Sequence, residues 1–274
     1  MLFRSPTIII GAGAPDLTKS GEFIFRVYPS ELAEGRFAAD YFHNIFKKSK
    51  AAVIAEQKHQ SLKESFTSRF KELGGNVVLD YTWPEKADAK ETKKALEQLK
   101  NKKPEAVYLL VSLSRVSDLL KEISSLKTKL IVFGSSDWDH SEILVIKEAE
   151  NVYYAVPQAV NLEELTNRSK QVFGKEINRS AAYFYDAVKM LAEVIKRTGT
   201  DKRTIRNTLV VSTYSQGASL SVIEFDNDRE LKNPLFEVKM VKGGQLISEQ
   251  SASSSATSVV ASSTVSSTTS STGQ

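Results

Sequence analysis

Short apolar runs alternate with amphipathic stretches between residues 50 and 137. The runs AAVIA, AVYLLV and KLIVF, which begin at residues 51, 106 and 129, contain almost no polar side chains. Such continuous runs are typical of strands that are covered by helices on both faces. The stretches between them place apolar residues at three- and four-residue steps, as helices do. This alternation predicts a parallel sheet with right-handed crossovers, and therefore an α/β fold with helices flanking the sheet.

The segments on either side of this alternation have patterns of their own. Residues 32–48 and 180–198 have the periodicity of helices, and a polar stretch follows Pro157. Residues 219–225 and 235–241 alternate apolar and polar side chains around a polar loop. This arrangement predicts either a hairpin or two strands at sheet edges.

The composition changes abruptly near the end of the chain. From Ser251 to Gln274 serine and threonine dominate, and no residue is charged. Such a tract buries too little apolar surface to offset the entropy that is lost when a chain becomes ordered. We therefore expect a disordered Ser/Thr-rich tail over residues 249–274.

The overall composition excludes several classes of function. There is no cysteine, which excludes disulfides, thiol catalysis and cysteine-ligated zinc. The 37 basic and 33 acidic residues are interleaved, a pattern typical of a solvated surface rather than of a nucleic-acid-binding one. The three histidines match no metal-ligand spacing. No apolar run approaches the roughly 20 residues of a transmembrane helix. We therefore expect no cofactor, no nucleic-acid partner and no transmembrane segment.

The opening segment, residues 6–21, is predicted to form a buried strand followed by a glycine-containing turn. Gly11 and Gly13 match the first two glycines of a dinucleotide-binding fingerprint, but Asp16 stands in place of the third. A strand follows rather than a helix, so no helix N-terminus is present to bind a pyrophosphate. The chain also has no Walker, GxSxG or HExxH sequence. The loop is therefore not expected to bind a nucleotide.

A polar and aromatic group, Asp137-Trp138-Asp139-His140, follows the predicted strand at residues 129–133. An aspartate at the carboxyl end of a parallel strand can bind an ammonium, ligate a metal or act as a base. The alternative is that Asp137 or Asp139 only caps the helix that follows. An enzyme that used these two aspartates would need a partner base or a metal, and the sequence indicates neither. We therefore predict no enzymatic activity.

Four strings resemble, in order and spacing, segments of one known family. They are GAGAPDLTKSG, FIFRVYPSELAEGRFAADYF, FTSRFKELGGNVV and AAYFYDAVKMLAEVIKRTG, within a match that runs from about Pro6 to Ile247. The family has the type I periplasmic-binding-protein fold of the leucine/isoleucine/valine-binding kind. Its members are the substrate receptors of branched-chain amino-acid ABC transporters. The resemblance implies a two-lobed α/β fold with parallel sheets flanked by helices.

The resemblance also implies how the chain divides. Residues 1–30 and 157–235 would form lobe one, residues 31–156 and 236–248 lobe two, and residues 249–274 the tail. Family members have further strand–helix units of lobe one before the position that Pro6 matches. We therefore expect an incomplete lobe one, as in a truncated or split gene product or in a reduced relative.

In this family a loop of lobe one binds the carboxylate of the amino-acid ligand through backbone amides and a side-chain hydroxyl. The resemblance places Ala12 and Gly13 in this loop. Ala12 retains the backbone contact, whereas Gly13 stands where the hydroxyl residue is expected. The loop is therefore expected to contribute backbone N–H groups only.

The resemblance assigns four further positions, all in lobe two, to the ligand. Lys58 matches a tyrosine that follows the first strand, and Ser112 stands where an aromatic residue often follows the third. The acid that binds the ligand's ammonium is matched by Asp137, or by Ser136 if the alignment shifts by one residue. Asp137 is the position that keeps the family's chemistry.

The function that the resemblance implies is that of a solute-binding receptor without catalysis. Its ligand would be an amino acid or a similar small polar molecule, held between lobes that close about a hinge. Its partner would be an ABC transporter permease, and its location would be extracytoplasmic, in the periplasm or at the cell surface. The alternative is a truncated or degenerate module with a structural or surface-interaction role. Self-association through the unfilled face of lobe one is expected of such a module.

Overall fold

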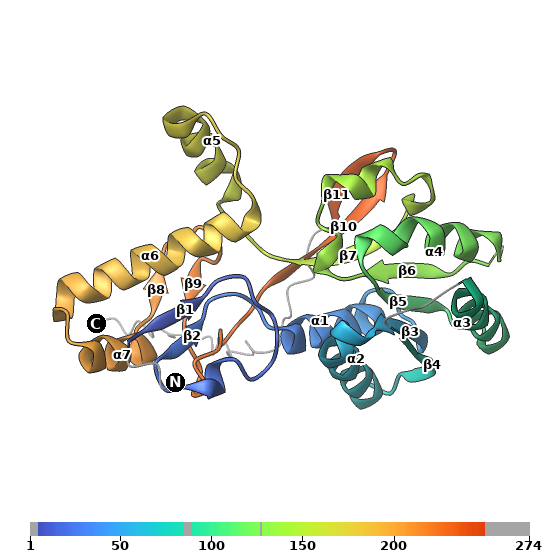
Figure 1. Ribbon diagram of the computed structural model, residues 1–274, viewed down its shortest axis with the longest axis horizontal. Coiled ribbons are helices and arrows are strands. Elements are labelled where there is room, and N and C mark those ends of the chain that lie inside the picture. The colour runs from blue at the N-terminus through green and yellow to red at the C-terminus, as the bar shows by residue number, and fades with distance from the viewer. Residues whose placement is uncertain (1–4, 85–88, 127, 250–274) are drawn as a thin grey trace, which may run out of the picture.

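The computed structural model describes residues 5–84, 89–126 and 128–249, which form two lobes side by side (Figure 1). The larger lobe is built on a seven-stranded sheet with the strand order β11-β10-β7-β6-β5-β3-β4. Its strands are β3 (Lys50–Glu56), β4 (Asn76–Trp83), β5 (Ala106–Leu110), β6 (Ile131–Gly134), β7 (Tyr153–Pro157), β10 (Phe236–Lys242) and β11 (Gln245–Glu249). The tail predicted at residues 249–274 lies outside the described residues, except for Glu249 at the end of β11.

The strands β4, β3, β5, β6 and β7 run parallel, as the strand–helix alternation predicts. Strand β10 pairs antiparallel with both β7 and β11. Gly243 and Gly244 have φ values of 59° and 71° and make the turn between β10 and β11. The hairpin predicted as one alternative for residues 219–225 and 235–241 is wrong, because the two stretches join different sheets.

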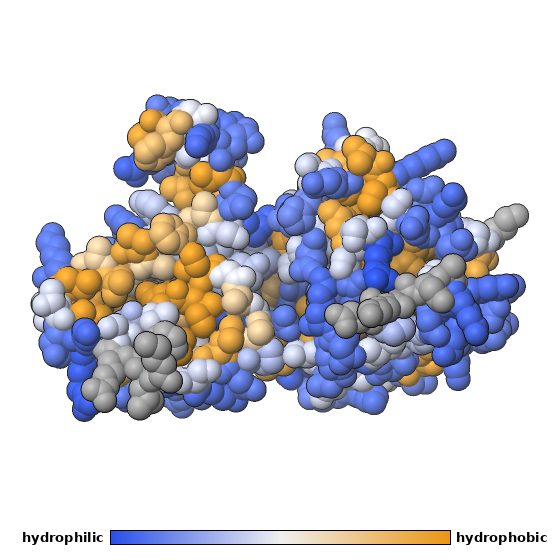
Figure 2. Space-filling view, viewed as in Figure 1, coloured by the Kyte–Doolittle hydropathy of each residue, from blue (hydrophilic) through white to orange (hydrophobic). Residues whose placement is uncertain are grey.

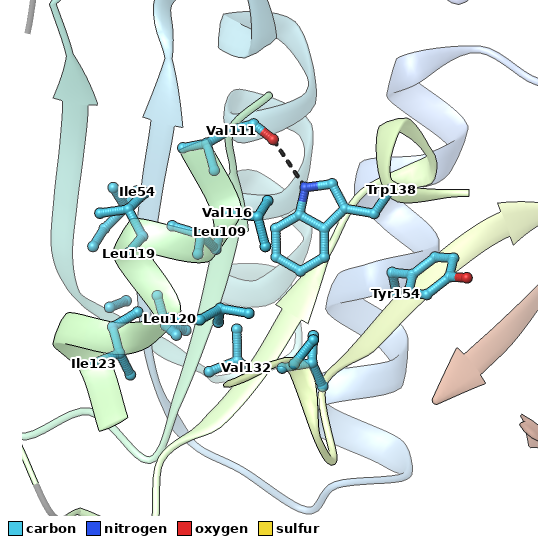
Figure 3. Close-up of a cluster of buried hydrophobic side chains, with 14 of the residues drawn as sticks. Ile54, Leu109, Val111, Val116, Leu119, Leu120, Ile123, Val132, Trp138 and Tyr154 are labelled. Atoms are coloured by element: carbon cyan, nitrogen blue, oxygen red, sulfur yellow. Dashed lines mark hydrogen bonds between the residues drawn. The ribbon is translucent and has the colours of Figure 1, made fainter. Parts of the chain in front are cut away.

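Helices cover both faces of the large sheet because its strands are apolar on both sides. The helices are α1 (Glu31–Asn44), α2 (Gln60–Glu72), α3 (Ala89–Lys102) and α4 (Leu113–Ser125). Phe42 of α1 and Phe66 of α2 pack against one face, with ring centroids 5.0 Å apart. Leu119 and Leu120 of α4 pack with Trp138 against the other (Figure 3). The short 3₁₀ helices are η1 (Thr18–Ser20), η2 (Gln57–His59), η3 (Ser136–Trp138), η4 (Ser141–Val145) and η5 (Lys147–Ala149).

The smaller lobe contains two two-stranded sheets and three helices. Its elements are β1 (Thr7–Ile9), β2 (Ile24–Arg26), β8 (Tyr214–Ser215), β9 (Val222–Ile223), α5 (Leu162–Phe173), α6 (Arg179–Thr198) and α7 (Lys202–Val211). Strands β1 and β2 pair parallel, and β8 and β9 antiparallel. Phe25, Tyr183 and Leu209 are fully buried between these elements. The smaller lobe therefore has a hydrophobic core of its own.

Helix α5 occupies the polar stretch after Pro157, and the sequence patterns did not predict it. None of its residues is buried. Its apolar residues Leu162, Leu165, Val172 and Phe173 lie at helical spacing, but the polar run at 166–171 separates them and resembles a loop in composition.

Three segments within the described part of the chain cross between the lobes (Figure 1). They are residues 27–30, between β2 and α1, residues 158–161, between β7 and α5, and residues 232–235, before β10. The second and third crossings run side by side, because the Gln158 N–H donates to the Leu235 carbonyl at 2.9 Å. A few short crossings of this kind are typical of two lobes that move about a hinge.

Candidate ligand-binding site

Three of the predicted site residues lie where neighbouring strands of the large sheet end. Lys58 follows β3, Ser112 follows β5 and Asp137 follows β6. Because β3, β5 and β6 are parallel neighbours, their carboxyl ends meet at one edge of the sheet, the place where open α/β sheets bind ligands. An open depression of about 470 Å³ lies there, lined by Lys58, Ser112, Leu113, Asp137, His140 and Glu142.

The Asp137 carboxylate is paired within this depression. Its Oδ2 lies 3.3 Å from the Lys58 ammonium and 3.3 Å from Nε2 of the buried His59. The proximity of His59, assisted by that of Lys58, holds the pKa of Asp137 below its usual value. Asp137 is therefore a carboxylate at neutral pH, suited to accepting a hydrogen bond from a cationic ligand group rather than to removing a proton.

Ser112 and Lys58 both lie near Glu56, the last residue of β3. Its Oε2 accepts from the Ser112 N–H at 3.1 Å and from the Ser112 hydroxyl at 2.6 Å. The Lys58 ammonium lies 3.8 Å from the same oxygen and is half exposed. Lys58 is thus held between two carboxylates and still presents its charge to the depression.

Ser136 faces away from the depression, toward α1. Its N–H and its hydroxyl each donate to the Glu34 carboxylate at 2.8 Å. The two alternatives for the predicted acid position therefore have different surroundings. Asp137 lines the depression, whereas the polar atoms of Ser136 are used by α1.

The buried carboxyl of Glu34 gives a testable pH dependence. Burial raises its pKa from 4.5 to about 7, against the opposing effect of the Ser136 hydrogen bonds. Between these two values the native state binds more protons than the unfolded state, so the free energy of unfolding falls as the pH rises. The titration of Glu34 should lower the free energy of unfolding by about 3 kcal/mol in total, and this decrease is complete above pH ~7. Urea denaturation of the wild type and of Glu34→Gln, at intervals across this pH range, measures it.

We expect Glu34→Gln to remove this decline because the amide does not titrate. Glu72→Gln is the matched control, since Glu72 is 47 % exposed and should keep the wild-type profile. Equal slopes for the wild type and Glu34→Gln would show that Glu34 does not titrate in this range.

The opening loop is held by its carbonyl groups. The buried Arg26 donates from Nη1 to the carbonyls of Ala12 at 3.0 Å and Ala14 at 2.6 Å. The Glu31 N–H donates to the Gly13 carbonyl at 2.8 Å. No described residue accepts a hydrogen bond from the N–H of Ala12 or Gly13. Both predicted loop residues therefore keep their backbone donors available.

Glu31, the first residue of α1, connects this loop to the depression. Its N–H contacts Gly13, as described above, and its carboxyl is close enough to His59 and Asp137 to interact with their charges. Burial, and to a smaller extent the charge of Asp137, raises the pKa of Glu31. The loop and the depression therefore lie on two sides of the N-terminus of α1.

A network of ion pairs joins the two lobes beside the site. Arg179, the first residue of α6, reaches the Asp139 carboxylate at 3.3 Å and that of Glu237 at 2.7 Å. Lys239 of β10 also contacts Asp139, at 2.7 Å. Sequence reasoning considered Asp139 only as a helix cap or a catalytic acid and missed the two cations. Residues so distant in the chain give no local signal of such a network.

A larger hollow of about 760 Å³ lies between α3 and α4, with Leu96, Lys100 and Leu119 in its lining. Most of its lining comes from α3 and α4, and only Trp83 comes from the end of a strand, so strand ends do not converge there. We therefore assign the candidate site to the smaller depression.

Metal-binding clusters and membrane-spanning helices are absent from the described residues. Within the described part of the chain, no group of three histidine, cysteine, aspartate or glutamate side chains is placed to hold a metal ion. The described helices also include none with the length and hydrophobicity needed to cross a membrane.

The chain matches the model of one protein family and the folds of many solved structures. Residues 2–244 match the family described as the receptor family ligand binding region. A Rhodospirillum rubrum protein described as a branched-chain amino acid ABC transporter superposes with a TM-score of 0.78 at 21% identity. The match covers 89% of this chain and 72% of that one.

Two other solved structures are similar. The leucine-binding protein LivK from Thermotoga maritima has a TM-score of 0.74 at 19% identity, over 90% of this chain and 72% of its own. A solute-binding protein of an ABC transporter from R. palustris, in complex with benzoate, has a TM-score of 0.70 at 17% identity, over 89% and 69%. No curated protein sequence matches the chain. The structural matches confirm the predicted type I periplasmic-binding-protein fold.

Proposed function

The chain belongs to the family of receptor ligand-binding regions, and we propose that it binds an amino acid or a similar small polar solute between its two lobes. The observation that carries this proposal is the convergence of Lys58, Ser112 and Asp137 at one open depression. The depression lies at the carboxyl ends of parallel strands, where a ligand reaches several loops at once. The opening loop, whose Gly13 carbonyl accepts from the Glu31 N–H at the start of α1, is available as the first wall of the site, and the depression forms the second.

The charges of the two walls suit a ligand that carries both a carboxylate and an ammonium. The N–H groups of Ala12 and Gly13 are oriented by the loop and have no described acceptor, so they can donate to a carboxylate. Asp137 can accept from an ammonium, in competition with Lys58. A ligand with a carboxylate but no ammonium would instead use the half-exposed Lys58. Binding of an amino acid should therefore depend on Asp137, whereas binding of an aromatic acid without an ammonium should depend on Lys58.

The proposed partner is an ABC transporter permease, and the proposed location is outside the cytoplasm. Support comes from the solved neighbours, which include the leucine-binding protein LivK and solute-binding proteins of ABC transporters. The proposed role is binding without catalysis, since the ion-paired Asp137 has a lowered pKa and makes a poor base at neutral pH.

The test is isothermal titration calorimetry with leucine, isoleucine and benzoate as separate ligands. We expect an amino acid to bind the wild type, and Asp137→Asn to weaken its binding about 10- to 100-fold because a charge-assisted hydrogen bond to the ammonium is lost. Lys58→Gln should leave amino-acid binding unchanged or tighten it, since it frees Asp137 from a competing cation. Asp228→Asn, an exposed change in the smaller lobe, should leave binding unchanged.

The results also discriminate between the alternatives. Binding of benzoate that depends on Lys58 and not on Asp137 would identify an aromatic acid as the ligand class. No heat with any of these ligands would argue for the alternative, an interaction module without a solute. Full amino-acid affinity in Asp137→Asn would place the ligand elsewhere.

A further inference from the structure

Helix α6 has two neighbouring apolar stripes, and the core of the smaller lobe fully buries only one of them. The first stripe is buried and consists of Tyr183, Ala187, Met190 and Val194. The second follows at steps of four, three and four residues and consists of Phe184, Val188, Leu191 and Ile195. Phe184 is 56% exposed and Val188 is 51% exposed. A helix that packs on one sheet needs a single stripe of about 100°, so the second stripe is suited to another contact.

The flanks of the second stripe are uncharged as well. Ala181, Tyr185 and Ala192 lie next to it on the side away from the core, and the exposed charged residues Lys189, Glu193 and Lys196 lie further around the helix. An ordinary solvent-facing helix surface carries such charges. The exposed side of α6 therefore resembles an interface more than a solvated surface.

Strand β1 has an open edge on the same lobe. The Thr7 N–H donates to the Phe23 carbonyl, and the Ile9 carbonyl accepts from the Val27 N–H. Because successive residues of a strand direct their backbone groups to opposite sides, Ile8 directs its N–H and carbonyl away from β2. β1 has no other strand beside it among the described residues. Two-stranded sheets are marginally stable alone, and unpaired edges of this kind readily add a strand.

The open edge and the second stripe belong to one surface. Ile8 and Ile10 from β1 and the following turn, and Leu191 and Ile195 from α6, are all partly buried against the same core. Figure 2 shows apolar side chains gathered over the smaller lobe in the region of α6 and β1. We call this surface, defined by Ile8, Phe184, Val188, Leu191 and Ile195, the α6–β1 surface.

We propose that the α6–β1 surface binds the same surface of a second copy of this chain across a two-fold axis. The two β1 strands would pair antiparallel and give a four-stranded sheet in the order β2-β1-β1-β2. A two-fold axis perpendicular to the sheet keeps both α6 helices on one face, so their second stripes meet. One two-fold symmetric contact would therefore bury both the open edge of β1 and the exposed stripe of α6.

The chemistry of the surface favours a second copy. An isologous contact must be self-complementary, and an uncharged stripe meets its own copy without like-charge repulsion. A foreign partner is usually selected by complementary charges, which this stripe lacks. One side of a 20-residue helix covers about 300 Å², estimated from a length of about 30 Å and a width of about 10 Å. With the strand edge added, the contact stays below the ~800 Å² per partner of a standard complex, so we expect a reversible dimer in the micromolar range.

The competing occupant is a strand–helix segment of another polypeptide. The solved neighbours are longer than this chain, since the matches cover 72% of the first and 69% of the third. Synthetic peptides with the sequences of their unmatched residues can test whether another polypeptide binds this surface. Either occupant would cover the same residues, so the experiment must distinguish them.

Sedimentation velocity of the full chain, from roughly 1 to roughly 100 µM, tests the proposal. We expect the mass to rise with concentration from 30.4 kDa toward twice that value. The double variant Phe184→Asp, Val188→Asp should remain monomeric throughout, with an unchanged circular dichroism spectrum because both side chains are exposed. Val211→Asp is the matched control: Val211 lies on α7, is 82% exposed and should leave the dimer intact.

Two readouts locate the contact. Hydrogen exchange of the Ile8 amide should slow as the concentration rises, because the β1 edge becomes paired. The chain has no cysteine, so oxidation of Val188→Cys should give a disulfide-linked dimer, whereas Val211→Cys should not. A wild type that is monomeric at every concentration, or a dimer that survives the double aspartate variant, would overturn the proposal. A monomer that binds synthetic strand–helix peptides from the unmatched part of the Rhodospirillum rubrum protein would assign the surface to the competing occupant.

Discussion

Arg26→Met is expected to lower the free energy of unfolding by about 3–5 kcal/mol, because it removes the cation from a buried ion pair. Arg26 is 1% exposed and donates from Nε to Glu230 at 2.6 Å. It also donates to the Ala12 and Ala14 carbonyls that fix the opening loop. Methionine keeps the apolar stem of the side chain but leaves a partly buried carboxylate and two carbonyls without their donor. Urea denaturation at neutral pH, followed by circular dichroism, measures the loss.

Arg36→Met is the matched control for this change. Arg36 is 52% exposed and lies 3.7 Å from Glu72, so its ion pair should contribute no more than about 1 kcal/mol. If Arg26→Met costs no more than Arg36→Met, the buried pair is not the anchor of the loop. The double variant Arg26→Met, Glu230→Gln should recover part of the loss, since it removes the unpaired carboxylate.

Arg26→Met should also affect the proposed ligand site, because it loosens the opening loop that forms the first wall. The N–H groups of Ala12 and Gly13 are oriented because their neighbouring carbonyls are held by Arg26 and Glu31. Without Arg26 the loop samples more conformations, and the entropy of ordering it is added to the cost of binding. We therefore expect the ligand affinity of Arg26→Met to fall even at temperatures where the protein stays folded.

The architecture could be predicted from the sequence where the pattern was strong and local. Continuous apolar runs such as the one at residues 106–111 predicted parallel strands, and the sheet confirms them. Helix α5 was missed because the polar residues at 166–171 interrupt its apolar ones, and none of its residues is buried. The partners of residues 219–225 and 235–241 depended on tertiary pairing, which a local pattern does not specify.

The sequence indicated where the candidate site lies, but not which hydrogen bonds its residues already make within the protein. The family resemblance assigned Lys58, Ser112 and Asp137 to the ligand, and the structure brings them together because each follows a strand of one parallel sheet. Their existing partners could not be predicted, since Ser112 donates to Glu56 and Ser136 donates to Glu34, which is distant in the chain. These contacts decide which polar groups still face a ligand. Whether the grouped residues bind one stays a prediction.

Trp138 anchors the second wall of the site. Its side chain is fully buried, and its indole Nε1–H donates to the Val111 carbonyl at 2.9 Å (Figure 3). The ring lies so close to Gly134 that a methyl group there would overlap it. The neighbouring residue in η3 is Asp137, so the buried ring fixes the turn that presents this carboxylate.

We expect Trp138→Ala to lower the free energy of unfolding by about 3–5 kcal/mol, because it leaves a cavity between α4 and the sheet. Trp138→Phe keeps most of the ring but leaves the buried Val111 carbonyl without its donor, which costs about 1–3 kcal/mol beyond the loss of volume. Urea denaturation measures both, and calorimetry should show that each variant binds an amino acid more weakly as Asp137 loses its fixed position.

Trp83, the second of the chain's 2 tryptophans, supplies the control. It is 2% exposed, but no described residue accepts a hydrogen bond from its Nε1–H. Trp83→Phe therefore loses the same volume without losing a hydrogen bond, and it lies away from the depression. We therefore expect Trp138→Phe to lose more stability than Trp83→Phe, because it loses the Val111 hydrogen bond whereas Trp83→Phe removes a buried N–H that has no described acceptor. Equal losses of stability, or full amino-acid affinity in Trp138→Phe, would mean that the indole only fills space and that Asp137 is positioned by its ion pairs with Lys58 and His59.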